Sequence, residues 1–174
     1  MRSEFEEKAI FALTQHGDSP YKLMNAFVIP NCSRLGHECD VLVIQKSRYV
    51  TEIELKATIS DLKADKKKRH KHESRYIRQL YFGLHEDIPY EAALPHIPET
   101  AGIMVFSKIN NPDSSWHNSY HCTIIRRPKP NRDAIKIDDK IERDLYQTMY
   151  YRYYNLLFER EWYNINHRNT GQEG

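Results

Sequence analysis

The chain has few cysteines, few glycines and no long apolar segment. Its three cysteines, Cys32, Cys39 and Cys122, are odd in number and lack paired spacing, which argues against a disulfide framework and favours reduced thiols. No apolar run approaches the length of a membrane span, and no basic-then-apolar leader opens the sequence. We therefore expect a cytoplasmic protein with no membrane partner.

No internal repeat or domain linker is visible, and 174 residues are enough for one domain with a substantial core. Charged residues make up 29% of the chain and balance to a net charge of +2. The balance is uneven along the chain, because residues 56–78 hold nine Lys or Arg against three Asp or Glu. Residues 126–136 form a second basic segment. Positive charge concentrated on a nearly neutral protein predicts a face that binds a polyanion.

The periodicity of the apolar residues predicts a mixed α/β fold. Ser60 is expected to cap the second helix, and Pro30 to end the first strand. We assign residues 1–136 to a core, 137–167 to a helical extension packed on that core, and 168–174 to a disordered tail. Helices are expected at 4–15, 61–76 and 137–167, and strands at 21–29, 39–45, 49–57, 79–84, 101–107 and 120–126.

Two of the predicted strands carry charges among apolar residues. Asp40 opens the apolar run 41–44, and Glu54 and Lys56 lie two apart within 49–57, so these two share one strand face. A tight antiparallel hairpin would bring Asp40 alongside them. Buried charges must be paired or bind a metal, and two carboxylates beside a lysine suit magnesium-assisted hydrolysis of a phosphodiester.

Two further acids flank this group. Glu38 and Glu52 share strand faces with Asp40 and Glu54, one pleat further out. They are either accessory metal ligands or partners of nearby lysines, and we favour the pairing with lysines.

On these residues the chain resembles the PD-(D/E)XK nuclease superfamily, with Asp40 on one strand and Glu54-x-Lys56 on the next. The resemblance covers residues 36–130 and points to the MmcB-like branch of bacterial and bacteriophage proteins, which are associated with DNA repair. Cys39 stands where proline is frequent in the superfamily. The likeness is carried further by Glu-Ile-Glu-Leu-Lys-Ala-Thr-Ile-Ser-Asp-Leu-Lys-Ala-Asp (52–65), the Lys71-His72 pair, Gln-Leu-Tyr-Phe-Gly-Leu (79–84) and Ile-Pro-Glu-Thr-Ala-Gly-Ile-Met-Val-Phe (97–106).

The resemblance implies a restriction-endonuclease-like α-β-β-β-α-β core, a divalent metal site and cleavage of nucleic acid. Asp40, Glu54 and the Leu55 carbonyl would hold Mg2+ through oxygen ligands, and Mn2+ would substitute for it. Lys56 would orient the attacking water or stabilise its deprotonated form. The expected activity is that of a metal-dependent phosphodiesterase, a DNA endonuclease.

Many members of the superfamily place one more acid on the first helix. Here Glu6 and Glu7 compete for that role, because each shares a partly apolar helical face. We favour Glu6, which would reach the same or a second ion through water.

The charged helix expected at 61–76 offers groups for nucleic acid. Asp65, Lys68, His72, Tyr76 and Gln79 recur at roughly helical spacing and would point toward the Glu54–Lys56 end of the strand. The alternative is a solvated face, the usual fate of a charge run. We assign DNA binding to Lys63, Lys67, Lys68, Arg69, Lys71, His72 and Gln79.

The sequence leaves several alternatives open. A repair-accessory protein could keep this fold and cut little by itself, although the intact acid–acid–lysine set argues against that. RNA is not excluded as the substrate, and a homodimer is left open. Trp116-His117 and His121-Cys122 offer too few ligands for a zinc site.

Overall fold

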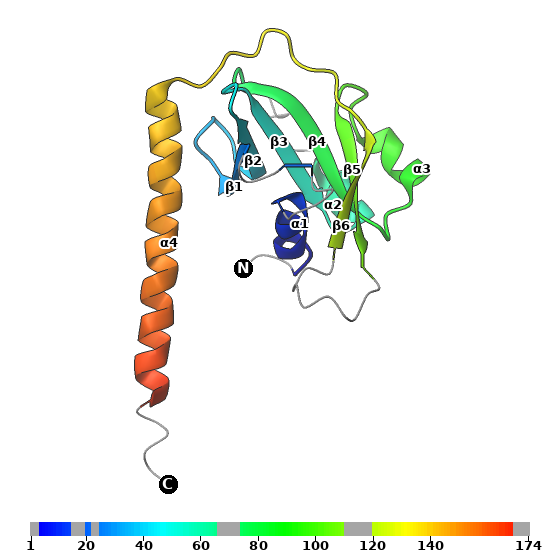
Figure 1. Cartoon of the computed structure of the whole chain (residues 1–174). Helices are drawn as coiled ribbons and strands as arrows, with labels where there is room; N and C mark the ends of the chain where they lie inside the picture. Colours follow the sequence, from blue (N-terminus) through cyan, green and yellow to red (C-terminus); the bar gives the residue numbers. More distant parts are fainter. Residues whose placement is uncertain (1–3, 15–19, 22–24, 66–73, 110–119, 169–174) are drawn as a thin grey trace. The chain divides into compact units, whose positions relative to one another are not determined.

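A six-stranded mixed sheet is the centre of the structure, a computed structural model that describes residues 4–14, 20–21, 25–65, 74–109 and 120–168 (Figure 1). The chain divides into two compact units, residues 1–137 and 138–174, and each is described by itself. None of the described helices is both long enough and apolar enough to cross a membrane. The elements are α1 (Glu4–Thr14), β1 (Ala26–Cys32), β2 (Cys39–Gln45), β3 (Val50–Lys56), α2 (Ile59–Asp65), β4 (Ile77–His85), α3 (Tyr90–Ala93), the 3-10 turn η1 (Leu94–His96), β5 (Gly102–Lys108), β6 (Tyr120–Arg126) and α4 (Asp139–Arg168).

The strands lie in the sheet in the order in which they occur in the chain. The pairs β1–β2, β2–β3 and β5–β6 are antiparallel, whereas β3–β4 and β4–β5 are parallel. Parallel neighbours need a crossover connection, and the segments that contain α2 and α3 make the two crossovers. The predicted mixed α/β fold is confirmed, and the first unit contains the expected helix, three strands, helix and strand in that order. The short α3 and η1 were not predicted.

Two apolar clusters cover the two faces of the sheet. The first joins α1 to the face that carries Val43, Ile53 and Leu55. The second joins α2, α3 and η1 to the face that carries Phe82 and Leu84. Successive side chains of a strand point to opposite faces, and β4 and β5 each contribute to both clusters.

Gly83 allows β4 to lie close to two large apolar side chains. A Cβ atom here would stand 2.7 Å from Cε2 of Phe106 and 2.8 Å from Cδ2 of Leu55, which is closer than carbon atoms pack. A larger residue would therefore displace Leu55, which lies between Glu54 and Lys56 in β3.

The first strand begins later than predicted. The expected strand at 21–29 is observed at Ala26–Cys32, and Tyr21 instead donates its backbone N–H to the carbonyl oxygen of Leu13, at 3.1 Å. Pro30 does not end the strand, because it pairs with Val41. Proline is tolerated there because β1 is an edge strand, where an N–H can be missing on the solvent side.

The second helix begins two residues earlier than predicted, and its cap is Thr58 rather than Ser60. The Thr58 hydroxyl accepts the N–H of Asp61 at 3.2 Å, and the Asp61 carboxylate accepts the N–H of Thr58 at 3.0 Å. This reciprocal pair is a capping box that satisfies two N–H groups at the helix start. The predicted helix is also too long, because residues 74–76 form a turn before β4.

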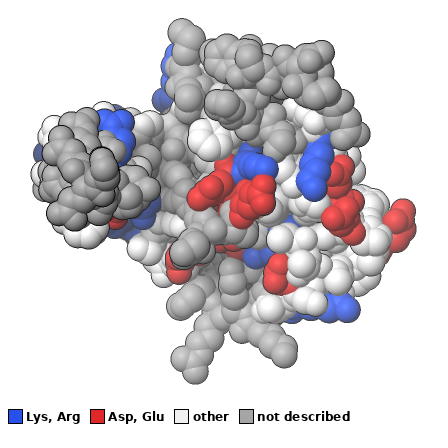
Figure 2. Space-filling model, turned by 90° about the horizontal axis from the view of Figure 1, so that it is seen from below, with Lys and Arg blue, Asp and Glu red and all other residues white. Residues whose placement is uncertain are grey.

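Some arginines outside residues 66–73 make contacts within the fold. Arg126 donates to the carbonyl oxygens of Ala101 and Pro98, both at 2.9 Å, and the Arg78 guanidinium lies 4.1 Å from the centre of the Tyr49 ring. Basic and acidic side chains lie side by side on the surface drawn in Figure 2. Residues 66–73, which carry most of the predicted DNA-binding lysines and arginine, lie outside the described part of the chain.

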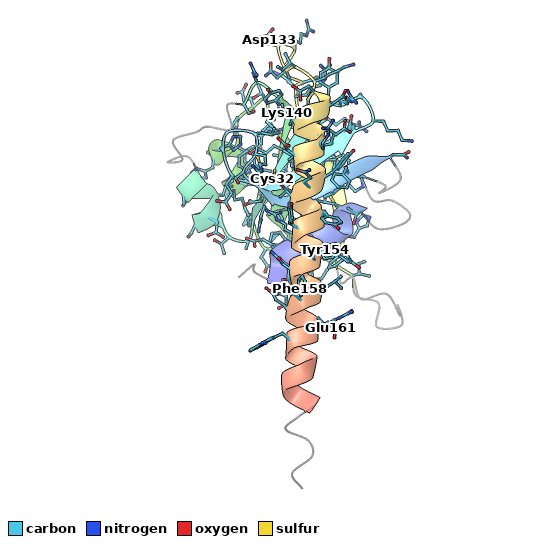
Figure 3. All side chains as sticks on the ribbon, turned by 90° about the vertical axis from the view of Figure 1, so that its left-hand side faces the viewer. Cys32, Asp133, Lys140, Tyr154, Phe158 and Glu161 are labelled. Atoms are coloured by element: carbon cyan, nitrogen blue, oxygen red, sulfur yellow. The ribbon has the colours of Figure 1, made fainter. Side chains whose placement is uncertain are left out.

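The second unit contains the long helix α4, where a helix was predicted. Its start is capped by Asp138, whose Oδ1 accepts the N–H of Ile141 at 2.8 Å. Figure 3 shows Lys140, Tyr154, Phe158 and Glu161 in order along the helix. The rings of Tyr150 and Tyr154 lie one turn apart and are tilted by 44° to each other, with centroids 4.5 Å apart. The packing of this helix on the core stays a prediction, and the expected disordered tail lies almost entirely outside the described residues.

Candidate functional site

Asp40 connects the ends of β2 and β3. Its carboxylate Oδ2 accepts a hydrogen bond from the backbone N–H of Leu55 at 2.8 Å. Val41 pairs with Ile53 in the ladder between the two strands, so Asp40 and Glu54 occupy the next positions outward. The Asp40 side chain thus serves as an acceptor at the end of the ladder, and it remains half-buried.

Glu54 and Lys56 form a buried ion pair on the face of β3 that α2 covers. Lys56 Nζ donates to Glu54 Oε2 at 2.9 Å, and the two residues are 5% and 0% exposed. Their register partners on β4 are Leu84 and Phe82, and Lys56 Nζ lies 6.0 Å from the centre of the Phe82 ring. A carboxylate out of contact with water needs a compensating charge, and this lysine provides one.

Asp40, Glu54 and Leu55 fit a hard divalent cation. The hydrogen bond from the Leu55 N–H places the Asp40 carboxylate against the backbone between Glu54 and Lys56. The Leu55 N–H points to β2, and in a strand the carbonyl of the same residue points to the same neighbour. Two carboxylates and a backbone carbonyl are the oxygen donors that Mg2+ prefers, and the half-exposed Asp40 gives an ion access from solvent.

Glu52 contacts a histidine that was not predicted as its partner. Its Oε1 lies 2.8 Å from Nε2 of His37, and both residues are buried. The Sγ of Cys39 lies 3.5 Å from the same His37 nitrogen. Sequence reasoning missed this group because Glu52 is 15 residues from His37, although a histidine and a cysteine two apart were a local signal. Glu38 is exposed.

Gln79 lies on β4, where a strand was predicted, so it does not extend the helical series that begins at Asp65. Its Oε1 accepts a hydrogen bond from the Thr51 hydroxyl at 3.3 Å, and the two residues are register partners. The side chains of Thr51 and Glu52 point to opposite faces of the sheet, and so do the side chains of Gln79 and Leu80. Gln79 therefore faces the α1 side of the sheet, away from Glu54.

The structure does not bring the helix of Glu6 to the face of Glu54. Glu6 is half-buried and Glu7 is exposed on α1, and α1 packs on the opposite face of the sheet. The role of Glu6 as an accessory ligand stays a prediction, and it requires an approach around the end of the sheet.

Among the predicted DNA-binding residues, the structure places Lys63 on the exposed side of α2. Lys67, Lys68, Arg69, Lys71 and His72 lie outside the described residues. Tyr49, Arg78 and Lys136 form a separate group, with the lysine 5.3 Å from the Tyr49 ring centre. This group lies where β3 and β4 begin, at the opposite end of β3 from Lys56.

Comparison with known proteins gives a family and a fold. A solved structure, the SPO1766 protein of unknown function from Silicibacter pomeroyi, superposes with a TM-score of 0.54 at 17% sequence identity, covering 80% of this chain and 84% of that chain. At this identity the likeness shows the fold alone. None of the curated proteins matches the chain significantly.

Residues 20–136 match the family described as MmcB-like, DNA repair protein MmcB-like. This match spans β1 to the end of the basic segment and includes Asp40, Glu54 and Lys56, and it indicates a role in DNA repair that involves contact with DNA. The chain belongs to the MmcB-like family of DNA repair proteins.

Proposed function

We propose that this chain is a metal-dependent nuclease that hydrolyses phosphodiester bonds in DNA, acting as an endonuclease in repair or in bacteriophage DNA metabolism. The observation that supports the proposal most strongly is the meeting of Asp40, the Leu55 backbone and the Glu54–Lys56 pair at the adjoining ends of two strands. Buried charges of this kind reduce stability unless they are compensated, and a catalytic role gives a reason for their presence.

Each residue of the site has a separate task in this proposal. Asp40, Glu54 and the Leu55 carbonyl would hold Mg2+, or Mn2+ in its place. When bound, the ion acts as a Lewis acid that lowers the pKa of water and offsets charge on the phosphate. Lys56 donates to the attacking water or hydroxide and stabilises the negative charge that develops during attack.

Lys56 can perform this task because its position is fixed. Its stem is buried beside Phe82, and its ammonium is held by Glu54 at 2.9 Å. A donor fixed before the reaction begins needs little reorganisation in the transition state, which makes its contribution to the rate large. The DNA backbone would be held by Lys63 and the lysines and arginine of residues 66–71, which neutralise phosphates irrespective of sequence.

A cleavage assay with the full chain tests the proposal. Supercoiled plasmid and circular single-stranded DNA are incubated with Mg2+, with Mn2+ and with EDTA, and the same set is repeated with Asp40→Asn. Circular substrates have no ends, so their cleavage demonstrates endonuclease activity. We expect cleavage that requires the metal and the Asp40 carboxylate. Binding of DNA without metal-dependent cleavage would refute the nuclease assignment and leave an accessory role in repair.

A further inference from the structure

A second group of ligands lies beside the proposed magnesium site and differs from it in chemistry. One ligand atom each from His37, Cys39 and Glu52 lies within 4.8 Å of the other two, and all three residues are buried. The group offers a nitrogen, a sulfur and an oxygen, whereas the site at Asp40 and Glu54 offers oxygen alone. Nitrogen and sulfur donors select zinc and similar transition metals over Mg2+.

We infer that His37, Cys39 and Glu52 bind a zinc ion that holds the start of β2 against β3. Tetrahedral zinc with ordinary bond lengths keeps a nitrogen and a sulfur ligand about 3.6 Å apart, and Nε2 of His37 lies 3.5 Å from Sγ of Cys39. The 2.8 Å between His37 and Glu52 is a hydrogen-bond distance. It has to open by roughly half an ångström to admit the ion.

A fourth ligand is available from the neighbouring strand. Cys32 on β1 is the register partner of Cys39 on β2, and side chains of directly opposed residues lie on the same face. Both cysteines are almost completely buried, at 1% and 0% exposed. Cys32 would convert a three-ligand group into a closed four-ligand site, which is typical of structural zinc.

The chemistry of binding is a simple exchange. The Cys39 and Cys32 thiols would each lose a proton to solvent, and their sulfur lone pairs would form bonds to zinc while His37 binds as the neutral imidazole. Burial, followed by the charge of Glu52, raises the pKa of the Cys39 thiol in the metal-free chain. Bound zinc would place positive charge beside the Glu52 carboxylate and the thiolate.

The position of the site gives zinc a structural task. Cys39 directly precedes Asp40, and Glu52 lies two residues before Glu54 on the same strand face. An ion bound to Cys39 and Glu52 would fix the spacing between the two segments that carry the proposed catalytic carboxylates. The zinc site can be tested without any nuclease assay. A result that refutes the zinc site would therefore leave the proposed nuclease function untouched, and the reverse also holds.

The experiment measures the zinc content of the protein and the absorption spectrum of the protein with bound Co2+. Full-length protein purified without chelator is analysed for zinc by mass spectrometry, and the metal-free protein is titrated with Co2+ alone. We expect about one zinc per chain and a sulfur-to-cobalt charge-transfer band with tetrahedral d–d bands. Cys39→Ala and Glu52→Gln should each lower zinc content at least tenfold, and Cys39→Ala should also remove the charge-transfer band.

Two matched variants serve as controls. Cys122→Ala removes a buried thiol outside the group, and Asp40→Asn removes a ligand of the proposed magnesium site, so both should keep zinc and the cobalt spectrum. The inference is overturned if the wild-type chain holds no zinc and shows no charge-transfer band, since that measurement does not depend on a variant folding. It is also overturned if Cys39→Ala behaves as Cys122→Ala does, or if the freshly purified protein contains a Cys32–Cys39 disulfide.

Discussion

The Asp40 carboxylate accepts the backbone N–H of Leu55, the residue between Glu54 and Lys56. This single hydrogen bond fixes the side chain of one strand against the backbone of the next, at the point where their ladder ends. It also means that part of the charge on Asp40 has a structural use. A test of its catalytic role must therefore keep the acceptor and remove only the charge.

Asp40→Asn satisfies that condition. The asparagine carbonyl can still accept the Leu55 N–H, so we expect the chain to fold with a midpoint of thermal unfolding close to that of the parent. Loss of a carboxylate from the proposed metal site should lower the cleavage rate on the order of a hundredfold or more. Calorimetric titration with Mn2+ should show weakened binding of the ion.

Asp133→Asn is the control for this change, because it removes an exposed carboxylate outside the site. It should bind Mn2+ and cleave DNA as the parent does. Parental cleavage by Asp40→Asn would contradict the assignment of Asp40 as a metal ligand.

The basic segment makes a prediction about binding as distinct from chemistry. Reversing charge at Lys67, Lys68 and Arg69 together should weaken DNA binding for all sequences, because fewer phosphates are neutralised and fewer counterions released. The slope of log affinity against log salt should become shallower by about one for each phosphate that is no longer neutralised. Fluorescence anisotropy across a series of salt concentrations measures both quantities, and Mn2+ binding should be unaffected.

A charge-matched control is available at the other end of the sheet. Lys46, Arg132 and Lys136 are exposed, and reversing them changes the net charge equally. If this control lowers affinity and flattens the salt slope while the first variant does neither, DNA binds where β3 and β4 begin, and residues 66–71 form only a solvated face.

The buried thiol of Cys122 predicts a loss of stability in alkali. Burial raises the pKa of this thiol from 9.0 to about 12. Between those values the unfolded chain has released a proton that the folded chain keeps, so stability is complete below the lower value and falls as the pH rises. The contribution of one such group is at most about 1.4 kcal/mol per pH unit.

Comparing the parent with Cys122→Ala isolates that contribution from the buried phenols of Tyr21 and Tyr81, whose pKa values burial also raises. Urea unfolding between about pH 8 and pH 11 should show a steeper decline for the parent. Parallel profiles for the two proteins would mean that Cys122 does not keep its proton in the folded state.

The central hairpin could be predicted from the sequence because local signals agreed there. An apolar run opened by Asp40, a short polar turn and the Glu54–Lys56 spacing predicted two paired strands, and the register confirms them. The end of β1 was misplaced, because Pro30 stops a central strand but not an edge strand. Gln79 was placed in one series with the charged residues before it because they recur at helical spacing, although the strand that contains it was predicted.

The candidate site was predictable only where its members are close in the sequence or carry a known motif. The contact between His37 and Glu52 depends on how β2 and β3 pair, and no local pattern specifies that. The sequence pattern also does not specify on which face of the sheet α1 packs. Glu6 was judged by its helical neighbours, whereas its distance from Glu54 is decided by which side of the sheet the helix covers.

Lys56 offers the sharpest test of the whole site. Lys56→Met keeps most of the stem volume beside Phe82 and removes the charge that compensates Glu54. Without metal, an uncompensated buried carboxylate should lower the free energy of unfolding by about 3 kcal/mol or more. If Glu54 is a metal ligand, saturating Mg2+ or Mn2+ should restore much of that loss, because the ion takes over the compensation. The restored protein should bind DNA and cleave it on the order of a hundredfold or more slowly, as when one transition-state donor is removed.

Thermal unfolding with EDTA and with metal measures the effect on stability, and a plasmid assay measures the effect on the cleavage rate. Lys46→Met is the control for loss of an exposed lysine. A variant that metal does not stabilise would contradict the assignment of Glu54 as a metal ligand, and one that cuts at the parental rate would remove Lys56 from the mechanism.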